Sequence, residues 1–137
     1  MHFSKTTEYA IRVLSYLERY GDSTHTVNQL HQELGLPYKY LTRVVTYLVK
    51  HGLIRSTRGR EGGIMLAKKA DDIRLCDILD AIGEPIESNR CILGFEKCDV
   101  SNPCALHDQW MTPKNIIETM LTTTTLASLL NNKETKL

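Results

Sequence analysis

Residues 58–63, with the sequence RGREGG, restrict the fold of this chain more than any other segment. They separate two short runs that are typical of β-strands, 53–57 and 64–67. Glycine adopts the positive φ angles that a tight hairpin tip requires, and three of these six residues are glycine. The segment therefore predicts a two-stranded β-hairpin with a glycine-rich tip.

Apolar residues at helical spacing predict three helices before the hairpin, over 4–20, 26–34 and 37–51. Thr26 lies three residues before a glutamine, which is the pattern of a capping box. Pro37 suits the first turn of the third helix, because its missing N–H would have no helical partner there. Short helices joined by a turn and followed by a hairpin form a winged helix-turn-helix, so we expect this fold for the first part of the chain.

The rest of the sequence predicts further helices interrupted by one long loop. Apolar residues predict a helix over 75–82, residues 86–104 show no period, and a long helix begins near residue 106. Pro113 is expected to kink or restart this helix, and Thr125 to cap a last short one. The predicted fold class is mainly α with a small β-hairpin.

We expect three parts along the chain: a winged helix-turn-helix domain at 1–84, a cysteine-rich loop at 85–105, and a long helix with a C-terminal tail at 106–137. A structureless loop of this length in a small protein usually has a function. The long helix carries an apolar stripe around Trp110, Ile117 and Met120. A second copy of the chain would bury this stripe by a symmetric contact, so a homodimer is predicted.

Charge is distributed unevenly along the sequence. The whole chain carries a net charge of +1, but residues 37–69 contain eight basic residues and one acidic residue, which gives +7. The other residues include nine basic and 15 acidic ones, which gives −6. A polyanion would be attracted to the middle of the sequence and repelled by the rest, although a solvated basic surface would carry the same charge.

One side of the third predicted helix, together with the hairpin, is expected to contact DNA. Polar and basic residues lie opposite the apolar positions of this helix, on a surface that can enter the major groove. Basic hairpin residues can reach the flanking backbone or the minor groove. The predicted DNA-binding residues are Tyr38, Lys39, Thr42, Arg43, Thr46 and Lys50 in the helix, and Arg55, Arg58, Arg60, Gly62 and Gly63 in the hairpin.

Three of the four cysteines lie in the predicted loop and form a candidate metal site. Their spacing is Cys91-x6-Cys98-x5-Cys104, followed by His107. Thiolates and imidazoles are ligands of zinc and of iron–sulfur clusters. The tight Cys-x-x-Cys pair of many zinc sites is missing, which favours a cluster, while zinc and free or oxidisable thiols stay open as alternatives. Cys76 lies on an apolar helix side and is expected to be a buried structural thiol.

Several motifs resemble the Rrf2 family of bacterial transcription regulators. They are YAIR at 9–12, YL at 40–41, GLIRSTRGREGGI at 52–64 and DILDAI at 77–82. The resemblance extends over nearly the whole chain, and the glycine-rich hairpin is its most specific part. It implies a homodimer that places two recognition helices on a palindromic operator in double-stranded DNA.

The segment CALHDQW at 104–110 resembles the iron–sulfur members of this family. This resemblance implies that Cys91, Cys98 and Cys104 bind a two-iron [2Fe-2S] cluster, with His107 as the fourth ligand. The first gap is one residue longer than in those relatives, so a [4Fe-4S] cluster stays open. Glu8 from the partner subunit is the alternative fourth ligand, because nitric-oxide-sensing relatives carry an aspartate at that position. Its other expected role is that of a first-turn acid favoured by the helix dipole.

These observations also exclude some classes of function. No nucleophile–base pair and no dinucleotide-binding glycine loop can be recognised, so an enzyme is not expected. Charged residues interrupt the apolar N-terminal segment and no run is long enough to cross a membrane, so we expect a cytoplasmic protein. The predicted function is a DNA-binding transcription regulator, expected to repress, whose operator affinity depends on a cluster that senses nitric oxide, redox state or iron–sulfur status. The alternatives are a thiol- or zinc-based regulator of the same fold and a metal-binding protein that does not act on DNA.

Overall fold

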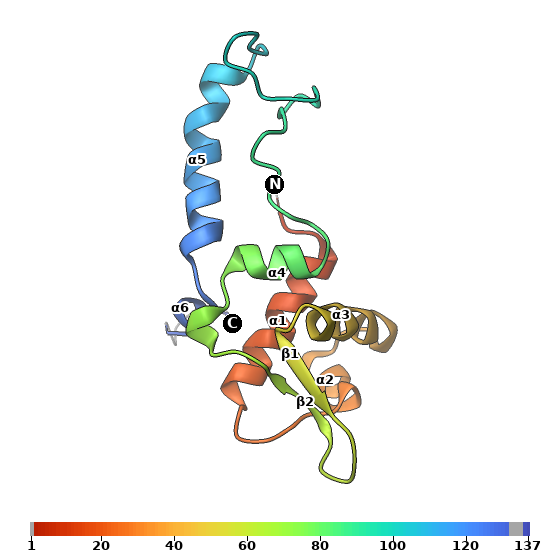
Figure 1. Ribbon diagram of the computed structural model, residues 1–137. Helices are drawn as coiled ribbons and strands as arrows, with labels where there is room; N and C mark the ends of the chain where they lie inside the picture. Colours follow the sequence, from red (N-terminus) through yellow and green to blue (C-terminus); the bar gives the residue numbers. More distant parts are fainter. Residues whose placement is uncertain (1, 132–135) are drawn as a thin grey trace.

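A computed structural model describes residues 2–131, 136 and 137 of the chain (Figure 1). Its elements are α1 (Lys5–Arg19), α2 (Val27–Leu34), α3 (Tyr38–Lys50), β1 (Ile54–Thr57), β2 (Gly63–Leu66), the 3-10 helix η1 (Ala70–Asp72), α4 (Leu75–Ala81), α5 (His107–Thr123) and α6 (Leu126–Leu130). None of these helices is both long and apolar enough to cross a lipid bilayer.

The central helix of the core is α1. Its apolar side is buried completely, with Ala10, Val13 and Leu14 at 0% exposure. These residues recur every three or four positions, so they lie on one side of the helix. Around them α1 packs against α3, α4 and β2. The predicted fold class, mainly α with a small β-hairpin, is confirmed.

Local capping interactions begin the helices where the sequence predicts them. The Ser4 hydroxyl accepts a hydrogen bond from the Thr7 N–H at 3.1 Å. Thr26 and Gln29 form the complete capping box of α2. Pro37 differs from its prediction by one position, since it is the N-cap of α3 rather than a residue of the first turn, and its ψ of 127° is extended.

The predicted hairpin is formed by β1 and β2, and we call residues 54–66 the wing. The strands are antiparallel, with Ile54 opposite Leu66. His25 forms a bridge on the other edge of β2, because its backbone exchanges hydrogen bonds of 2.8 and 3.0 Å with the backbone of Ile64. The base of the wing is thereby fixed to the segment between α1 and α2.

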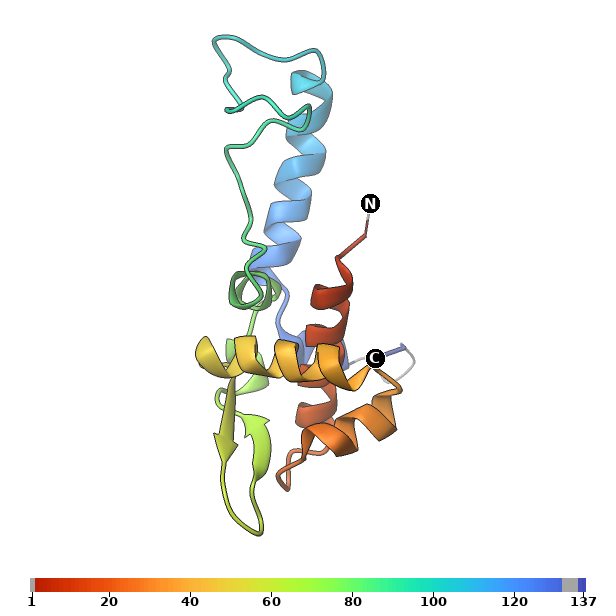
Figure 2. The ribbon, with the colours of Figure 1, turned by 90° about the vertical axis from the view of Figure 1, so that its right-hand side faces the viewer.

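Residues 85–123, which we call the arm, extend from the winged-helix part (Figures 1 and 2). Residues 85–106 contain no helix or strand, as predicted. They run out beside α5, which then leads back to the core. The end of the arm and the tip of the wing lie at opposite ends of the molecule (Figure 1).

The predicted apolar stripe of α5 is divided between two sides of the helix. Trp110 and Ile117 line a groove between α5 and the loop. Ile116 and Met120 face solvent, with exposed fractions of 65% and 47%. The loop therefore already covers part of the predicted stripe within the same chain, while Met120 stays exposed, and burial of the stripe by a second copy stays a prediction.

Pro113 does not interrupt α5, which is one continuous helix. The sequence predicted a kink or a restart at this proline; the continuous helix rules out the restart, and the kink stays a prediction. Proline removes the backbone hydrogen bond that residue 113 would donate to the carbonyl of Gln109. Both residues are exposed, so water can satisfy this carbonyl.

The last described helix, α6, returns the chain to the core. The Leu126 side chain is 0% exposed, and its N–H donates to the carbonyl of Ile73 at 2.7 Å. Thr125 caps the helix through its side chain, as predicted. Residues after α5 thus pack on the winged-helix part. The division of the chain into three parts stays a prediction, and residues 132–135 of its tail lie outside the described residues.

We predict that Gly63→Ala destabilises the wing. A Cβ at this position would lie 2.7 Å from the carbonyl oxygen of His25, so the bridge between His25 and β2 must open. Overpacking of this kind costs about 1–3 kcal/mol. Urea unfolding measures the loss, and Ser56→Ala at an exposed position of β1 is the control. Equal stability of Gly63→Ala and the wild type would contradict this explanation.

Candidate nucleic-acid interface and cysteine cavity

The side of α3 that faces solvent carries the residues predicted for the recognition helix. Leu41, Val44 and Leu48 fill the core from the opposite side. A surface of this composition has the donors and acceptors needed to contact base edges and phosphates. The six predicted residues are all exposed: Tyr38, Lys39, Thr42, Arg43, Thr46 and Lys50.

Positive charge is displayed on α3, on the wing and on the segment that follows the wing. All eight basic residues between positions 37 and 69 are exposed, including Arg55, Arg58 and Arg60 of the wing. The Arg43 guanidinium lies over the Tyr47 ring, and its Nε donates to the Tyr47 hydroxyl at 3.0 Å. This contact holds Arg43 along the helix. The structure thus presents the basic segment as an accessible surface.

Thr42 and Thr46 use their hydroxyl hydrogens within α3. Thr42 Oγ1 donates to the Tyr38 carbonyl at 3.0 Å, and Thr46 Oγ1 donates to the Thr42 carbonyl at 2.8 Å. Each hydroxyl oxygen is therefore left as an acceptor beside an exposed methyl group. Such side chains are suited to amino groups of bases and to thymine methyl groups.

Gly62 and Gly63 are half-buried, unlike the exposed residues at the wing tip. A Cβ on Gly62 would lie 2.6 Å from the carbonyl oxygen of Thr57. Close packing inside the wing therefore requires glycine at this position as it does at Gly63. Contact of these glycines with DNA stays a prediction.

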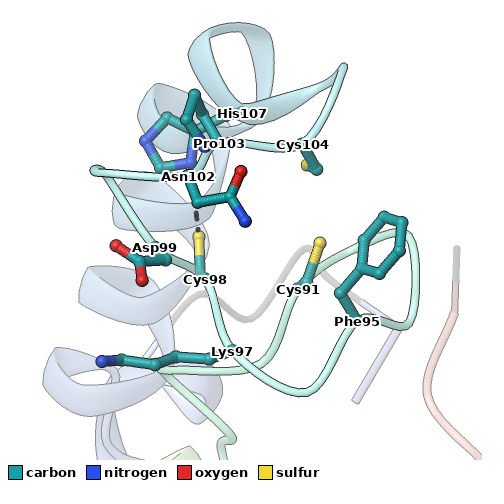
Figure 3. A pocket seen from close by; sticks show the side chains of 9 residues that line it. All are labelled: Cys91, Phe95, Lys97, Cys98, Asp99, Asn102, Pro103, Cys104 and His107. Atoms are coloured by element: carbon teal, nitrogen blue, oxygen red, sulfur yellow. Dashed lines mark hydrogen bonds between the residues drawn. The ribbon is translucent and has the colours of Figure 1, made fainter.

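Cys91, Cys98, Cys104 and His107 line one cavity of about 280 Å³ at the end of the arm (Figure 3). His107 is the first residue of α5 and is 8% exposed. The thiols of Cys91 and Cys98 point toward the segment that carries Cys104 and His107 (Figure 3). The Sγ atom of Cys98 lies 3.6 Å from Nδ1 of His107. The fold therefore brings together four side chains that span 17 positions of the sequence.

These four side chains surround the cavity without converging on a single point. Within the part of the chain that the structure describes, no three His, Cys, Asp or Glu side chains are grouped closely enough to hold one metal ion. The chemistry of these four side chains, thiolates with one imidazole, is that of zinc ligands and of cluster ligands alike.

The backbone around Cys91 favours the thiolate form of this side chain. Burial acts to raise the pKa of the thiol, which is 5% exposed. The backbone groups of Leu93, Phe95 and Gly94 and the neighbouring Cys104 outweigh burial and lower this pKa below its ordinary value. Burial and the Cys91 thiol raise the pKa of Cys104. Cluster sulfurs accept backbone hydrogen bonds, so Cys91 has surroundings suited to a metal ligand.

Sequence reasoning missed the residues that complete the cavity wall. Asp99 forms a local turn, because its carboxylate accepts hydrogen bonds from the N–H and the hydroxyl of Ser101 at 2.9 and 2.6 Å. These bonds lower the pKa of Asp99. The Asp-x-Ser pattern at 99–101 is a turn signal that could have located this bend. The additional wall residues are Phe95, Lys97, Asp99, Asn102 and Pro103.

Glu8 does not line this cavity in its own chain. It lies in the first turn of α1, where its carboxylate accepts a hydrogen bond from Lys5 Nζ at 2.7 Å. This hydrogen bond lowers the pKa of Glu8. Within one chain Glu8 is therefore an ion-paired acid at a helix start, and its role as a ligand across a dimer stays a prediction.

Cys76 is only partly buried, so the prediction of a buried structural thiol is wrong in degree. Leu75, Ile78 and Leu79 occupy the buried side of α4, and Cys76 lies beside them. Burial raises the pKa of its thiol. Cys76 does not line the cavity, which makes it a matched control for the loop cysteines.

Comparison with known proteins identifies the family. The sequence profile of the Rrf2 family, described as an iron-dependent transcriptional regulator, matches residues 3–132. The chain belongs to the Rrf2 family. A protein of Aquifex aeolicus (strain VF5) named as an HTH-type transcriptional regulator is 33% identical over 136 residues, which cover 98% of this chain and 94% of the relative.

Two solved structures of regulators share the fold of this Rrf2 chain. CymR, the global cysteine regulator of B. subtilis, has a TM-score of 0.78 at 26% identity and covers 94% of this chain and 95% of its own. IscR of T. potens has a TM-score of 0.76 at 25% identity, and the match covers 98% of this chain and 89% of the IscR chain. The winged-helix fold is thus confirmed. Membership of this family makes the chain a transcription regulator and implies that it binds DNA, and the relatives that match it are regulators.

Proposed function

We propose that this Rrf2 protein is a homodimeric regulator whose affinity for its operator is controlled by an iron–sulfur cluster in the arm. One observation carries the proposal. Three cysteines and a histidine meet at one cavity, at the end of an arm whose base is built into the winged-helix part. The loop also resembles that of the iron–sulfur members of the family.

Cys91, Cys98, Cys104 and His107 are the proposed ligands. When bound, the cluster supplies a centre that exchanges electrons and reacts with nitric oxide or oxidants. Both [2Fe-2S] and [4Fe-4S] clusters take four protein ligands, which equals the number of thiol and imidazole groups around the cavity, and the resemblance favours [2Fe-2S]. His107 is preferred to Glu8 because it lines the same cavity as the thiols.

The proposed ligands control the conformation of the loop. Residues 85–106 have no helix or strand to hold them in one arrangement. Ligand bonds at positions 91, 98, 104 and 107 would divide this segment into short closed loops and remove much of its conformational freedom. A complete switch of DNA occupancy requires the two states of the arm to differ by about 5.5 kcal/mol in their effect on binding.

The proposed DNA contacts come from α3 and the wing. The exposed side of α3 would enter the major groove, with Arg43 and Lys50 near phosphates or guanine edges. Arg58 and Arg60 at the wing tip would reach the flanking backbone. Two copies of this surface, related by the symmetry of a dimer, would meet a palindromic operator.

The proposed dimer contact is the side of α5 that faces solvent. Ile116 and Met120 are large apolar side chains with exposed fractions of 65% and 47%. A second copy of α5 would remove this surface from water through a symmetric contact. Burial of apolar area contributes about 25 cal/mol for each Å².

A thiol-based regulator is a second candidate that uses the same loop. The Cys98 thiol is only partly buried and lies 3.6 Å from the His107 imidazole, so oxidants can reach it. The similarity to CymR, named as a global cysteine regulator, also favours this candidate. Such a protein would contain no iron and would respond to oxidants through Cys98.

Removal of a wing arginine should weaken binding to any DNA duplex. Arg58→Ala is expected to lower the slope of log affinity against log salt by about 1.8 for a dimer, because the variant loses one phosphate contact in each of two wings and each contact releases counterions. Fluorescence anisotropy with a random-sequence duplex over a salt series measures the slope. Arg90→Ala removes the same charge from the arm and is the control. A slope that Arg58→Ala leaves unchanged would show that this arginine does not contact DNA.

Removal of one proposed ligand should abolish the cluster. Wild-type protein purified without oxygen is expected to contain iron and sulfide and to absorb visible light, whereas Cys98→Ala should lose all three signals. Cys76→Ala should keep them, because Cys76 does not line the cavity. The measurements are absorbance and iron and sulfide analysis.

The same preparations separate the two candidate functions. An iron-free wild type that binds DNA would support the thiol-based regulator. A cluster whose removal leaves operator affinity unchanged would contradict control by the cluster, while DNA binding by α3 and the wing would stand.

A further inference from the structure

The carboxylate of Glu84 joins the base of the arm to the start of α1. Glu84 lies between the end of α4 and the loop that carries the cysteines. Its Oε2 atom accepts a hydrogen bond from the Ser4 hydroxyl at 2.8 Å and another from the Thr7 hydroxyl at 2.8 Å. These contacts connect residues that are 80 and 77 positions apart in the sequence.

The two hydroxyl groups depend on this carboxylate. Thr7 is 1% exposed, so water cannot easily replace Glu84 as the acceptor for its hydroxyl, and the other acceptor beside it, the Ser4 hydroxyl, lies farther away at 3.2 Å. The Ser4 hydroxyl accepts the N–H of Thr7 at 3.1 Å, and its own hydrogen goes to Glu84. Hydrogen bonds to a charged acceptor are stronger than those between neutral groups. Glu84 therefore fixes both the cap and the first turn of α1.

The first turn of α1 is close to the helix proposed to contact DNA. Tyr9 follows Thr7 by two residues, and its ring meets the ring of Tyr40 on α3 edge to face, with centroids 6.0 Å apart. The rest of α1 packs against α3 and β2. Because packed interiors transmit displacements, a shift at the start of α1 would move α3 or the wing.

We propose that Glu84 is a positioning residue that couples the state of the loop to the orientation of α1 and, through Tyr9 and Tyr40, to α3. This inference rests on the proposed function, because Glu84 would connect the cavity to the DNA-binding surface that the proposed function assumes. An ordered loop holds Glu84 on Ser4 and Thr7. A relaxed loop frees Glu84, and the first turn of α1 loses its acceptor.

The measurement is the ratio of operator affinities with and without the cluster. The operator is a duplex that the wild-type protein selects from a random-sequence library, and anisotropy without oxygen gives the two affinities. Allosteric ratios commonly lie between about 5-fold and 150-fold. Glu84→Ala is expected to bring this ratio to within about threefold of unity, while its absorbance, iron and sulfide contents match those of the wild type.

Matched variants separate coupling from a structural effect. Thr7→Val keeps the shape of the side chain but removes one donor, so it should lower the ratio. Glu84→Gln keeps an acceptor oxygen for both hydroxyls and should retain most of the ratio. Glu87→Gln removes the same charge from a carboxylate that pairs with Arg90 at 2.8 Å in the loop, and it should behave like the wild type. Thermal unfolding of each variant reports any loss of stability separately.

The outcomes distinguish this inference from the function on which it rests. A wild-type ratio of one would overturn control by the cluster and this inference with it. Another outcome is a clear wild-type ratio of operator affinities that both Glu84→Ala and Thr7→Val retain. This outcome would overturn the role of Glu84 and leave control by the cluster in place. Loss of the ratio in these two variants, with its retention in Glu84→Gln and Glu87→Gln, would support the coupling.

Discussion

The burial of α1 is the packing interaction on which the other parts of the structure depend. The helix lies at the centre of the core and packs against α3, α4, β2 and α6. Its first turn meets Glu84 at the base of the arm. Near its end, the ring of Tyr16 packs edge to face on the ring of His25, which is bridged to β2. One helix therefore connects the arm, α3 and the wing, and a close-packed interior around it transmits small displacements.

The arm is attached to the winged-helix part at both of its ends. It leaves after α4, where Glu84 binds α1, and it returns through α6, where Leu126 is fully buried. A segment tied at two points cannot relax at its far end without changing the forces at its base. This geometry favours control of DNA binding through the core, because all residues that line the cysteine cavity lie between positions 91 and 107 and none belongs to α3 or the wing.

Short-range signals in the sequence predicted most of the fold. The capping box at Thr26 and the glycine-rich wing depend on neighbours within a few residues, and the structure confirms them. The conformation of the loop had no such signal, because an irregular backbone has no period. The sequence named the four side chains around the cavity through a resemblance, but their meeting required the loop to fold back on the start of α5. No local signal predicted that α5 continues through Pro113 or that the loop covers Trp110 and Ile117, because both features depend on the arrangement of the chain in three dimensions.

The arm and residues 37–69 lie apart in the structure (Figure 1) and carry net charges of opposite sign. The arm, residues 85–123, contains five acidic and three basic residues, which gives a net charge of −2, whereas residues 37–69 carry +7. A DNA duplex bound to α3 and the wing would be repelled weakly by the arm, so DNA and a group in the cavity would not compete for the same surface. An effect of one on the other must then pass through the protein itself. The contacts at both ends of the arm, with α1 and with the core around Leu126, are the routes that the structure offers for it.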